Sequence, residues 1–168
     1  MSDLDAAPTV VVREPGTGRG TWAMESVFEH LLESPPGTPG LGVALVTQPP
    51  GIATPLHRHT RESESFFLLE GEMTYRAGDQ DHELYAGCFI HLPSGIPHAF
   101  RIRGAEPARF LAIVDPGGLL RLYDEVGLPA PELRLPGPDG QGPEVEIPRW
   151  VEVGPRYGLE VVGPPIPE

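Results

Sequence analysis

Between residues 42 and 114, short runs of apolar and β-branched residues alternate with turns that contain glycine or proline. Runs of this length and spacing are typical of β-strands. No stretch between them leaves room for the helix that a parallel crossover requires, so the strands are expected to pair antiparallel. The sequence therefore predicts an all-β sandwich or barrel. The expected strands are 42–47, 54–59, 64–70, 72–77, 81–85, 88–92, 97–103 and 108–114.

The segment before these strands has a less regular pattern. Residues 1–20 are expected to form an N-terminal arm, in which 9–12 could make a short strand. The alternating glycines of 16–20 indicate a flexible loop, because no βαβ unit surrounds them as a nucleotide-binding loop would require. Residues 24–33 fit a helical period as well as a strand, so the pattern alone leaves both open.

The segment after the strands is expected to contain one helix. Asp115 is predicted to cap it, with Pro116 in its first turn and Gly127 at its end. Residues 128–148 are rich in proline and glycine and are predicted to form an irregular loop or a segment that changes between order and disorder. The apolar residues of 150–168 are numerous enough to pack back on the body.

The charge, the cysteine content and the lengths of the apolar runs indicate which partners and which compartment to expect. The formal net charge of −12 would repel a phosphate backbone, which argues against nucleic acid. Cys88 is the single cysteine, so an internal disulfide is impossible and a reducing compartment is expected. The N-terminus lacks a signal-peptide pattern, and no apolar run has the length of a membrane span. We therefore expect a cytoplasmic protein that binds neither nucleic acid nor membrane.

Four residues combine into a candidate metal site. His57 and His59 are two apart in a predicted strand, so both side chains point to the same face. Glu64 comes on the next strand after a bend, and His98 comes from a distant strand. Three imidazoles and one carboxylate suit a single divalent transition metal, which could be Fe, Mn, Co, Ni, Cu or Zn. An octahedral metal would keep open positions for water, dioxygen or a substrate.

These spacings resemble the two sequence motifs of the cupin superfamily. The matching positions are Gly51, His57, His59, Glu64, Gly71, Gly87, Pro93, Gly95 and His98. One position departs from the pattern, since Ile102 stands where the family often has an asparagine that is not a metal ligand. Further runs, EGEMTYRAG, GIPHAF, DPGG and RYGLEVVGPP, are similar to those of small single-domain bacterial cupins described as quercetin-2,3-dioxygenase-like.

The resemblance implies a jelly-roll β-barrel over residues 21–115 and a C-terminal helical, proline-rich extension over 116–168 that packs on the barrel. It favours a strand for residues 24–33 and implies a homodimer, with edge strands 9–12 and 24–33 as candidates for pairing across a two-fold axis. It also implies that Glu64 is catalytic, taking a hydroxyl proton from the substrate in addition to binding metal.

Alternation from the ligands predicts the substrate pocket. Its expected wall comprises Phe66, Leu68, Met73, Tyr75, Phe100 and Ile102. Such a wall is apolar and partly aromatic, which suits an aromatic or polyketide-like small molecule. The same residues would equally fill the core of a barrel without any ligand.

The sequence leaves three functions open. The first is a metal-dependent dioxygenase acting on a flavonol- or polyketide-like molecule. The second is a non-oxidative isomerase, cyclase or lyase that tailors a secondary metabolite with the metal as a Lewis acid. The third is a non-enzymatic cupin that only binds a small molecule.

Five further residues are given structural or solvent-facing roles. Glu62 is interpreted as a pocket-edge or solvated carboxylate. His30, His82 and His91 are interpreted as structural or solvent-facing. Cys88 is expected to be an inert buried thiol, because the sequence gives it no activating partner.

Overall fold

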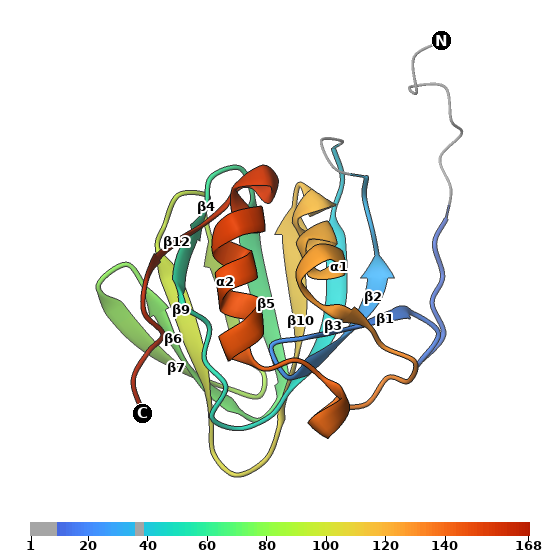
Figure 1. Ribbon diagram of the computed structural model, residues 1–168, viewed down its shortest axis with the longest axis horizontal. Helices are drawn as coiled ribbons and strands as arrows, with labels where there is room; N and C mark the ends of the chain where they lie inside the picture. Colours follow the sequence, from blue (N-terminus) through green and yellow to red (C-terminus); the bar gives the residue numbers. More distant parts are fainter. Residues whose placement is uncertain (1–9, 36–38) are drawn as a thin grey trace.

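A computed structural model describes residues 10–35 and 39–168. Two antiparallel sheets face each other, and the helices lie together on one side, with α2 across the front of the sheets beside α1 (Figure 1). Of the predicted strand 9–12, residue 9 lies outside the described residues, and residues 10–12 are exposed and belong to no strand. Within the described part of the chain no helix is long and apolar enough to cross a membrane.

The larger sheet has seven strands. Their spatial order is β11 (Leu128–Pro129), β1 (Arg19–Ala23), β2 (Ser26–Leu32), β3 (Gly42–Gln48), β10 (Ala108–Asp115), β5 (Ser63–Glu70) and β8 (Phe89–Leu92). Residues 24–33 therefore form mainly a strand, as the resemblance implied. Because β2 pairs with β1 on one side and β3 on the other, it has no free edge for pairing across a dimer axis.

The smaller sheet has five strands. Their order is β12 (Leu159–Gly163), β4 (Leu56–His59), β9 (His98–Arg103), β6 (Glu72–Ala77) and β7 (Gln80–Tyr85). From β3 to β10 the chain alternates between the two sheets, except at the β6–β7 hairpin, and this alternation makes the fold an all-β jelly roll. Each strand predicted between residues 42 and 114 is present, with ends shifted by two residues at most. Strands β11 and β12 come from the C-terminal extension and complete the two sheets.

The core lies between the sheets. Alternate residues of β3, β5 and β10 are buried, as the two-residue period of a strand dictates. The rings of Phe66, Phe100 and Phe110 contact one another from both sheets. Aromatic contacts of this kind add stability beyond the burial of apolar area, by about 0.5–1.5 kcal/mol per pair.

The first predicted helix is present in a different form. Asp115 is the last residue of β10 rather than a cap, and Pro116 precedes a 3₁₀ helix, Gly117–Arg121, with no side-chain capping bond. The prediction of an Asp115 cap was therefore wrong, because Asp115 continues its ladder opposite Ser63. The helix α1 (Leu122–Val126) follows, and Gly127 ends it as predicted.

The proline-rich segment also differs from its prediction. A 3₁₀ turn covers Gly137–Asp139, and α2 runs from Pro143 to Val153, so residues 143–148 are helical rather than irregular. Proline in the first turn of a helix removes an N–H that has no intrahelical partner, so Pro143 fits there. A second short 3₁₀ turn, Gly154–Tyr157, leads into β12.

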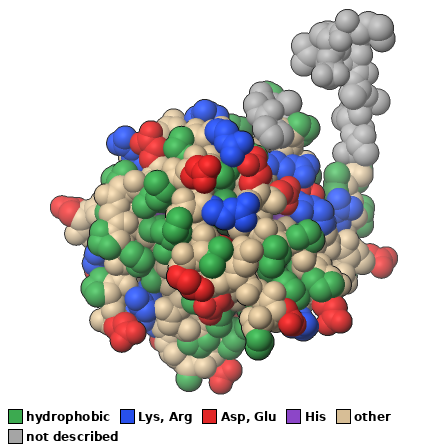
Figure 2. Space-filling view, in the orientation of Figure 1, with side chains coloured by type: hydrophobic (Ala, Val, Ile, Leu, Met, Phe, Trp, Pro, Cys, Tyr) green, Lys and Arg blue, Asp and Glu red, His purple; other side chains and the backbone are tan. Residues whose placement is uncertain are grey.

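The buried face of α2 packs on the barrel through Glu146, Trp150 and Val153. The outward surface beside α1 and α2 mixes hydrophobic, acidic and arginine side chains (Figure 2). The strand pattern could not predict this helix. Through Trp150, α2 forms part of the wall of the site described next.

Candidate metal centre

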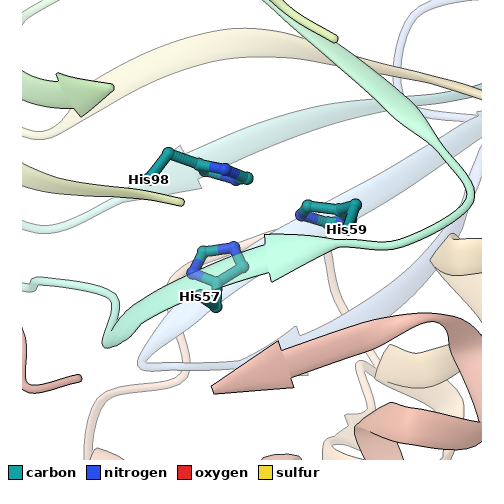
Figure 3. Close-up of side chains that lie close together, drawn as sticks. All are labelled: His57, His59 and His98. Carbon is teal, nitrogen blue, oxygen red and sulfur yellow. The ribbon is translucent and has the colours of Figure 1, made fainter. Parts of the chain in front are cut away.

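Three histidines converge between the sheets. His57 and His59 lie on β4, and His98 begins the neighbouring strand β9, directly opposite His57 in the ladder. All three are buried, and one ring nitrogen from each lies within 4.8 Å of the others. Figure 3 shows the three rings turned toward one another from the two strands. The i, i+2 spacing read from the sequence therefore places both β4 histidines on the inner face, as predicted.

Backbone carbonyls orient two of the rings. His57 Nδ1 lies 2.7 Å from the carbonyl oxygen of Pro55, and His98 Nδ1 lies 2.9 Å from that of Ile96. A carbonyl accepts only, so Nδ1–H donates and the lone pair remains on Nε2. This is the usual way in which a protein fixes the tautomer of a metal-binding imidazole.

Two of the three histidines have buried ring nitrogens without a hydrogen bond. Both ring nitrogens of His59 and Nε2 of His98 are buried without a hydrogen bond. Leaving a buried polar atom unpaired costs about 1–3 kcal/mol. A cation held by the lone pairs would remove that cost, so the donor set fits a metal.

Two of the three histidines, His57 and His59, are held in the neutral form that binds metal. Burial lowers the pKa of His57 well below its ordinary value, and the neighbouring His98 and His59 lower it further. Burial likewise lowers the pKa of His59 to about 4, although Glu64 opposes the shift. Neutral imidazole is the ligand form, so neither ring must lose a proton to bind metal near pH 7.

Glu64 stands beside the cluster on the opposite sheet. Its Oε2 lies 3.3 Å from His98 Nε2, and Tyr75 Oη donates to the same oxygen over 3.3 Å. Burial works to raise the pKa of Glu64, but the contact with His98 and the fields of His59 and His57 outweigh it and lower the pKa to about 2. The tight group of nitrogens comprises the three histidines, and Glu64 adjoins it as an ionised carboxylate.

A small cavity opens beside the centre. Its volume is about 30 Å³, and His57 and Glu64 form part of its lining. Of the predicted pocket wall, Phe66 and Phe100 line this cavity. Leu68, Met73, Tyr75 and Ile102 are buried in the core and are not among its lining residues.

Much of the cavity wall lies outside the two motifs. These lining residues are Met24, Phe28, Val46, Gln48, Thr54, Phe110, Ala112, Leu119, Leu120, Tyr123 and Trp150. The helical stripe after Asp115 hinted at an apolar face, but no periodicity indicated that this face, or Trp150, would reach the cavity.

The remaining candidate residues lie apart from the cluster. Glu62 is buried at the β4–β5 bend, where burial raises the pKa of its carboxyl. His30 is buried against Thr21, whereas His82 and His91 are exposed. Cys88 is half-buried rather than buried.

The fold is a two-sheet jelly roll. Three inward-facing histidines and an adjacent glutamate form a candidate metal site inside this β-barrel. Residues 44–114 match the family described as the cupin domain. This matched segment, which contains the three histidines and Glu64, is a cupin domain.

Known relatives share only part of their length with the chain. Quercetin 2,3-dioxygenase of Bacillus subtilis is 26% identical over 87 residues, which are 52% of this chain and 26% of that protein. An oxalate-binding protein of Thermotoga maritima is 32% identical over 66 residues, which are 39% of this chain and 54% of that protein. The matched segments thus span about a quarter and about half of these two relatives.

Among solved structures, a predicted oxalate decarboxylase from Thermotoga maritima superposes with a TM-score of 0.53 at 26% identity. The match covers 64% of this chain and 98% of that structure. The match supports the jelly-roll assignment. Because nearly all of that structure is matched but only 64% of this chain, this chain has segments that the smaller barrel lacks.

Proposed function

We propose that the chain is a metal-dependent cupin enzyme, most simply a dioxygenase that acts on an oxygenated aromatic molecule of flavonol or polyketide type. The observation that carries the proposal is the meeting of three buried imidazoles and an ionised carboxylate at the wall of an aromatic-lined cavity. The partial similarity to quercetin 2,3-dioxygenase supports the same class of reaction.

Each group of the site has a separate task in this proposal. His57, His59, Glu64 and His98 would hold one divalent ion of Fe, Mn, Co, Ni, Cu or Zn. When bound, such an ion supplies Lewis-acid or redox chemistry through its open coordination positions. The phenyl rings of Phe66 and Phe100 would hold a flat substrate body by stacking against it.

Glu64 is the proposed proton acceptor. Its carboxylate lines the cavity and is ionised, so it can take a proton from a substrate hydroxyl that enters there. Tyr75 donates to Oε2, which restrains the carboxylate. Removing the hydroxyl proton raises the electron density of the substrate oxygen, which is what oxidative attack on an aromatic ring needs.

Substrate entry requires a wall to move. A cavity of about 30 Å³ has room for about two water molecules. Pockets for small organic ligands usually measure roughly 300–1,000 Å³. The wall contributed by α2 belongs to neither sheet, so its displacement breaks no strand ladder but does break the contacts of Glu146 with Met24 and of Arg149 with Glu125. We propose that the substrate enters there and that these contacts re-form once it is bound.

Two other functions are alternatives to the dioxygenase. A non-oxidative isomerase, cyclase or lyase would use the same ion only to polarise a carbonyl group. The similarity to an oxalate-binding protein favours a different alternative, a cupin that holds an oxygen-rich small molecule without turnover.

The need for dioxygen separates these functions. Metal-loaded protein would be incubated with flavonols and related phenols, with and without air, while oxygen uptake and product are followed. A dioxygenase consumes oxygen in step with product and stops under anaerobiosis. Turnover at an unchanged rate without oxygen would exclude it in favour of the Lewis-acid function, and stoichiometric binding without turnover would favour the binder. The matched controls are His98→Ala, which removes a proposed ligand, and His82→Ala, which changes an exposed histidine.

A further inference from the structure

Trp150 is the residue of α2 that comes closest to the metal centre. Its side chain is 2% exposed and lines the cavity. Its ring meets the His57 ring edge-on, with centroids 5.6 Å apart, and lies 6.0 Å from the ring of Tyr123. A group bound between the metal centre and α2 would therefore touch this indole.

The indole N–H of Trp150 has no hydrogen-bond partner although it is buried. An indole nitrogen can only donate, and a buried one normally finds an acceptor. The other tryptophan of the chain follows that rule, since Trp22 Nε1 donates to the carbonyl oxygen of Arg134 over 2.8 Å. A buried donor without an acceptor reduces stability by about 1–3 kcal/mol, so a bound molecule that offers an acceptor to Trp150 would recover this free energy.

Other contacts fix α2 in this place. Glu146 Oε2 accepts the Met24 N–H over 2.5 Å, and Arg149 donates to the carbonyl oxygen of Glu125. Arg156 pairs with the carboxylate of Glu125 over 2.9 Å. These bonds hold the indole of Trp150 at the cavity wall. In that position its N–H has no acceptor within the protein.

We infer that Trp150 is a specificity-determining residue that binds the substrate, its N–H donating to a substrate oxygen. Because the indole touches His57, that acceptor must lie next to the atom that reaches the metal. The substrate class is therefore one with two neighbouring oxygens, such as an α-hydroxyketone, a catechol or a hydroxamate. The inference rests on the proposed metal-dependent function but needs no oxidative step.

The test uses maltol, a small hydroxypyrone with the two neighbouring oxygens of a flavonol, and protein loaded with diamagnetic zinc. With two tryptophans in the chain, ¹⁵N-labelled protein gives two indole N–H signals, which Trp22→Phe and Trp150→Phe assign. Maltol is expected to shift the Trp150 signal to higher proton frequency and to leave the Trp22 signal in place. A Trp150 signal that stays fixed while calorimetry shows maltol saturating the zinc-loaded protein would overturn the inference.

The variants give a second readout. Trp150→Phe keeps an aromatic wall and removes the donor, so its maltol affinity should fall about tenfold, the usual worth of one buried hydrogen bond, at unchanged zinc content. Trp22→Phe is the matched control and should bind maltol like the parent. Equal affinity in the two variants would contradict the inference.

The two proposals can fail separately. If no phenol is oxidised but the Trp150 signal shifts with maltol, the dioxygenase proposal fails and the recognition role stands. The signal is measured in the unaltered chain, so a folding defect in Trp150→Phe would not leave the question open.

Discussion

Tyr75 Oη donates a 3.3 Å hydrogen bond to Glu64 Oε2 across the space between the two sheets. Both side chains are buried, and Tyr75 lies on β6 whereas Glu64 lies on β5. Burial raises the pKa of Tyr75 well above its ordinary value, and the adjacent Glu64 adds to the shift, so the phenol keeps its proton and acts as a donor. A residue that the sequence assigned to the substrate wall thus contacts the proposed metal ligand.

Replacing Tyr75 with phenylalanine should weaken metal binding while preserving the packing of the ring. Groups that orient metal ligands typically contribute about 10–100-fold to affinity. The Tyr75–Glu64 bond is long, so we expect about tenfold, measured by competition with a chelator of known affinity. Tyr85→Phe, at an exposed position on β7, should leave the affinity unchanged. An unaltered affinity in Tyr75→Phe would show that the phenol does not position Glu64.

Glu64→Gln should separate metal binding from proton transfer. The amide keeps the shape and one oxygen of the side chain but cannot serve as the base. General-base catalysis is typically worth about 10²–10⁴-fold in rate, so activity should fall by more than metal occupancy does. A variant with full metal and near-parental turnover of the identified substrate would remove Glu64 from the proton-transfer role.

Glu146 should make stability depend on pH. Burial raises its pKa to about 7 in the folded protein, against an ordinary value of 4.5, although the Met24 N–H opposes the shift. A raised carboxyl pKa means that the folded state holds the proton more tightly than the unfolded state does. The contribution of protonated Glu146 to the free energy of unfolding is therefore complete below pH 4.5 and is lost as pH rises through 7.

Glu146→Gln should remove that dependence and keep an oxygen for the Met24 N–H. The stability of the variant relative to the parent should then increase by about 3 kcal/mol between pH 4.5 and pH 8. Denaturant unfolding at a series of pH values measures this difference. Parallel stability curves for the two proteins would contradict the assignment.

We propose that the chain forms a homodimer through the outer face of the larger sheet. By register, Phe89, Phe67, Leu111 and Leu45 form an apolar row across four strands, with Phe67 37% and Phe89 59% exposed. The exposed pair of Arg109 and Glu70 borders this row and offers both signs of charge to a symmetric second copy.

Light scattering at micromolar concentration checks the assembly. Phe89→Asp should shift the mass toward the monomer value of 18.1 kDa, whereas Val162→Asp, at an exposed site on the smaller sheet, should not. A parent protein that already has the monomer mass would contradict the proposal.

The strand pattern predicted the fold because most of the barrel strands are bounded by glycine or proline turns. The i, i+2 spacing of His57 and His59 likewise foretold their shared inner face. Alternation along β5 and β9 identified Phe66 and Phe100 as inward-facing, but it could not tell a cavity wall from a filled core. Leu68, for example, is as inward-facing as Phe66 yet does not line the cavity.

The sequence predicted a C-terminal helical extension, which is present, but it could not predict that a helix of this segment would form part of the cavity wall. The prolines of the segment indicated a loop, yet Pro143 occupies the first helical turn, where a missing N–H does no harm. The burial of Glu146 and Trp150 depends on where α2 packs against the barrel, which is a long-range property. Local patterns contain no information about that packing, so the wall that completes the site could be found only in the folded structure.

We propose that His57, His59, Glu64 and His98 together bind one transition-metal ion. Elemental analysis of protein purified without chelator, followed by reloading of the apo-protein with Fe, Mn, Co, Ni, Cu or Zn, tests it most directly. We predict close to one metal per chain, lost in His57→Ala, His59→Ala and His98→Ala and kept in His91→Ala, at an exposed position. A parent protein that is isolated without metal and takes up none of the six ions would show that these four residues do not form a metal site.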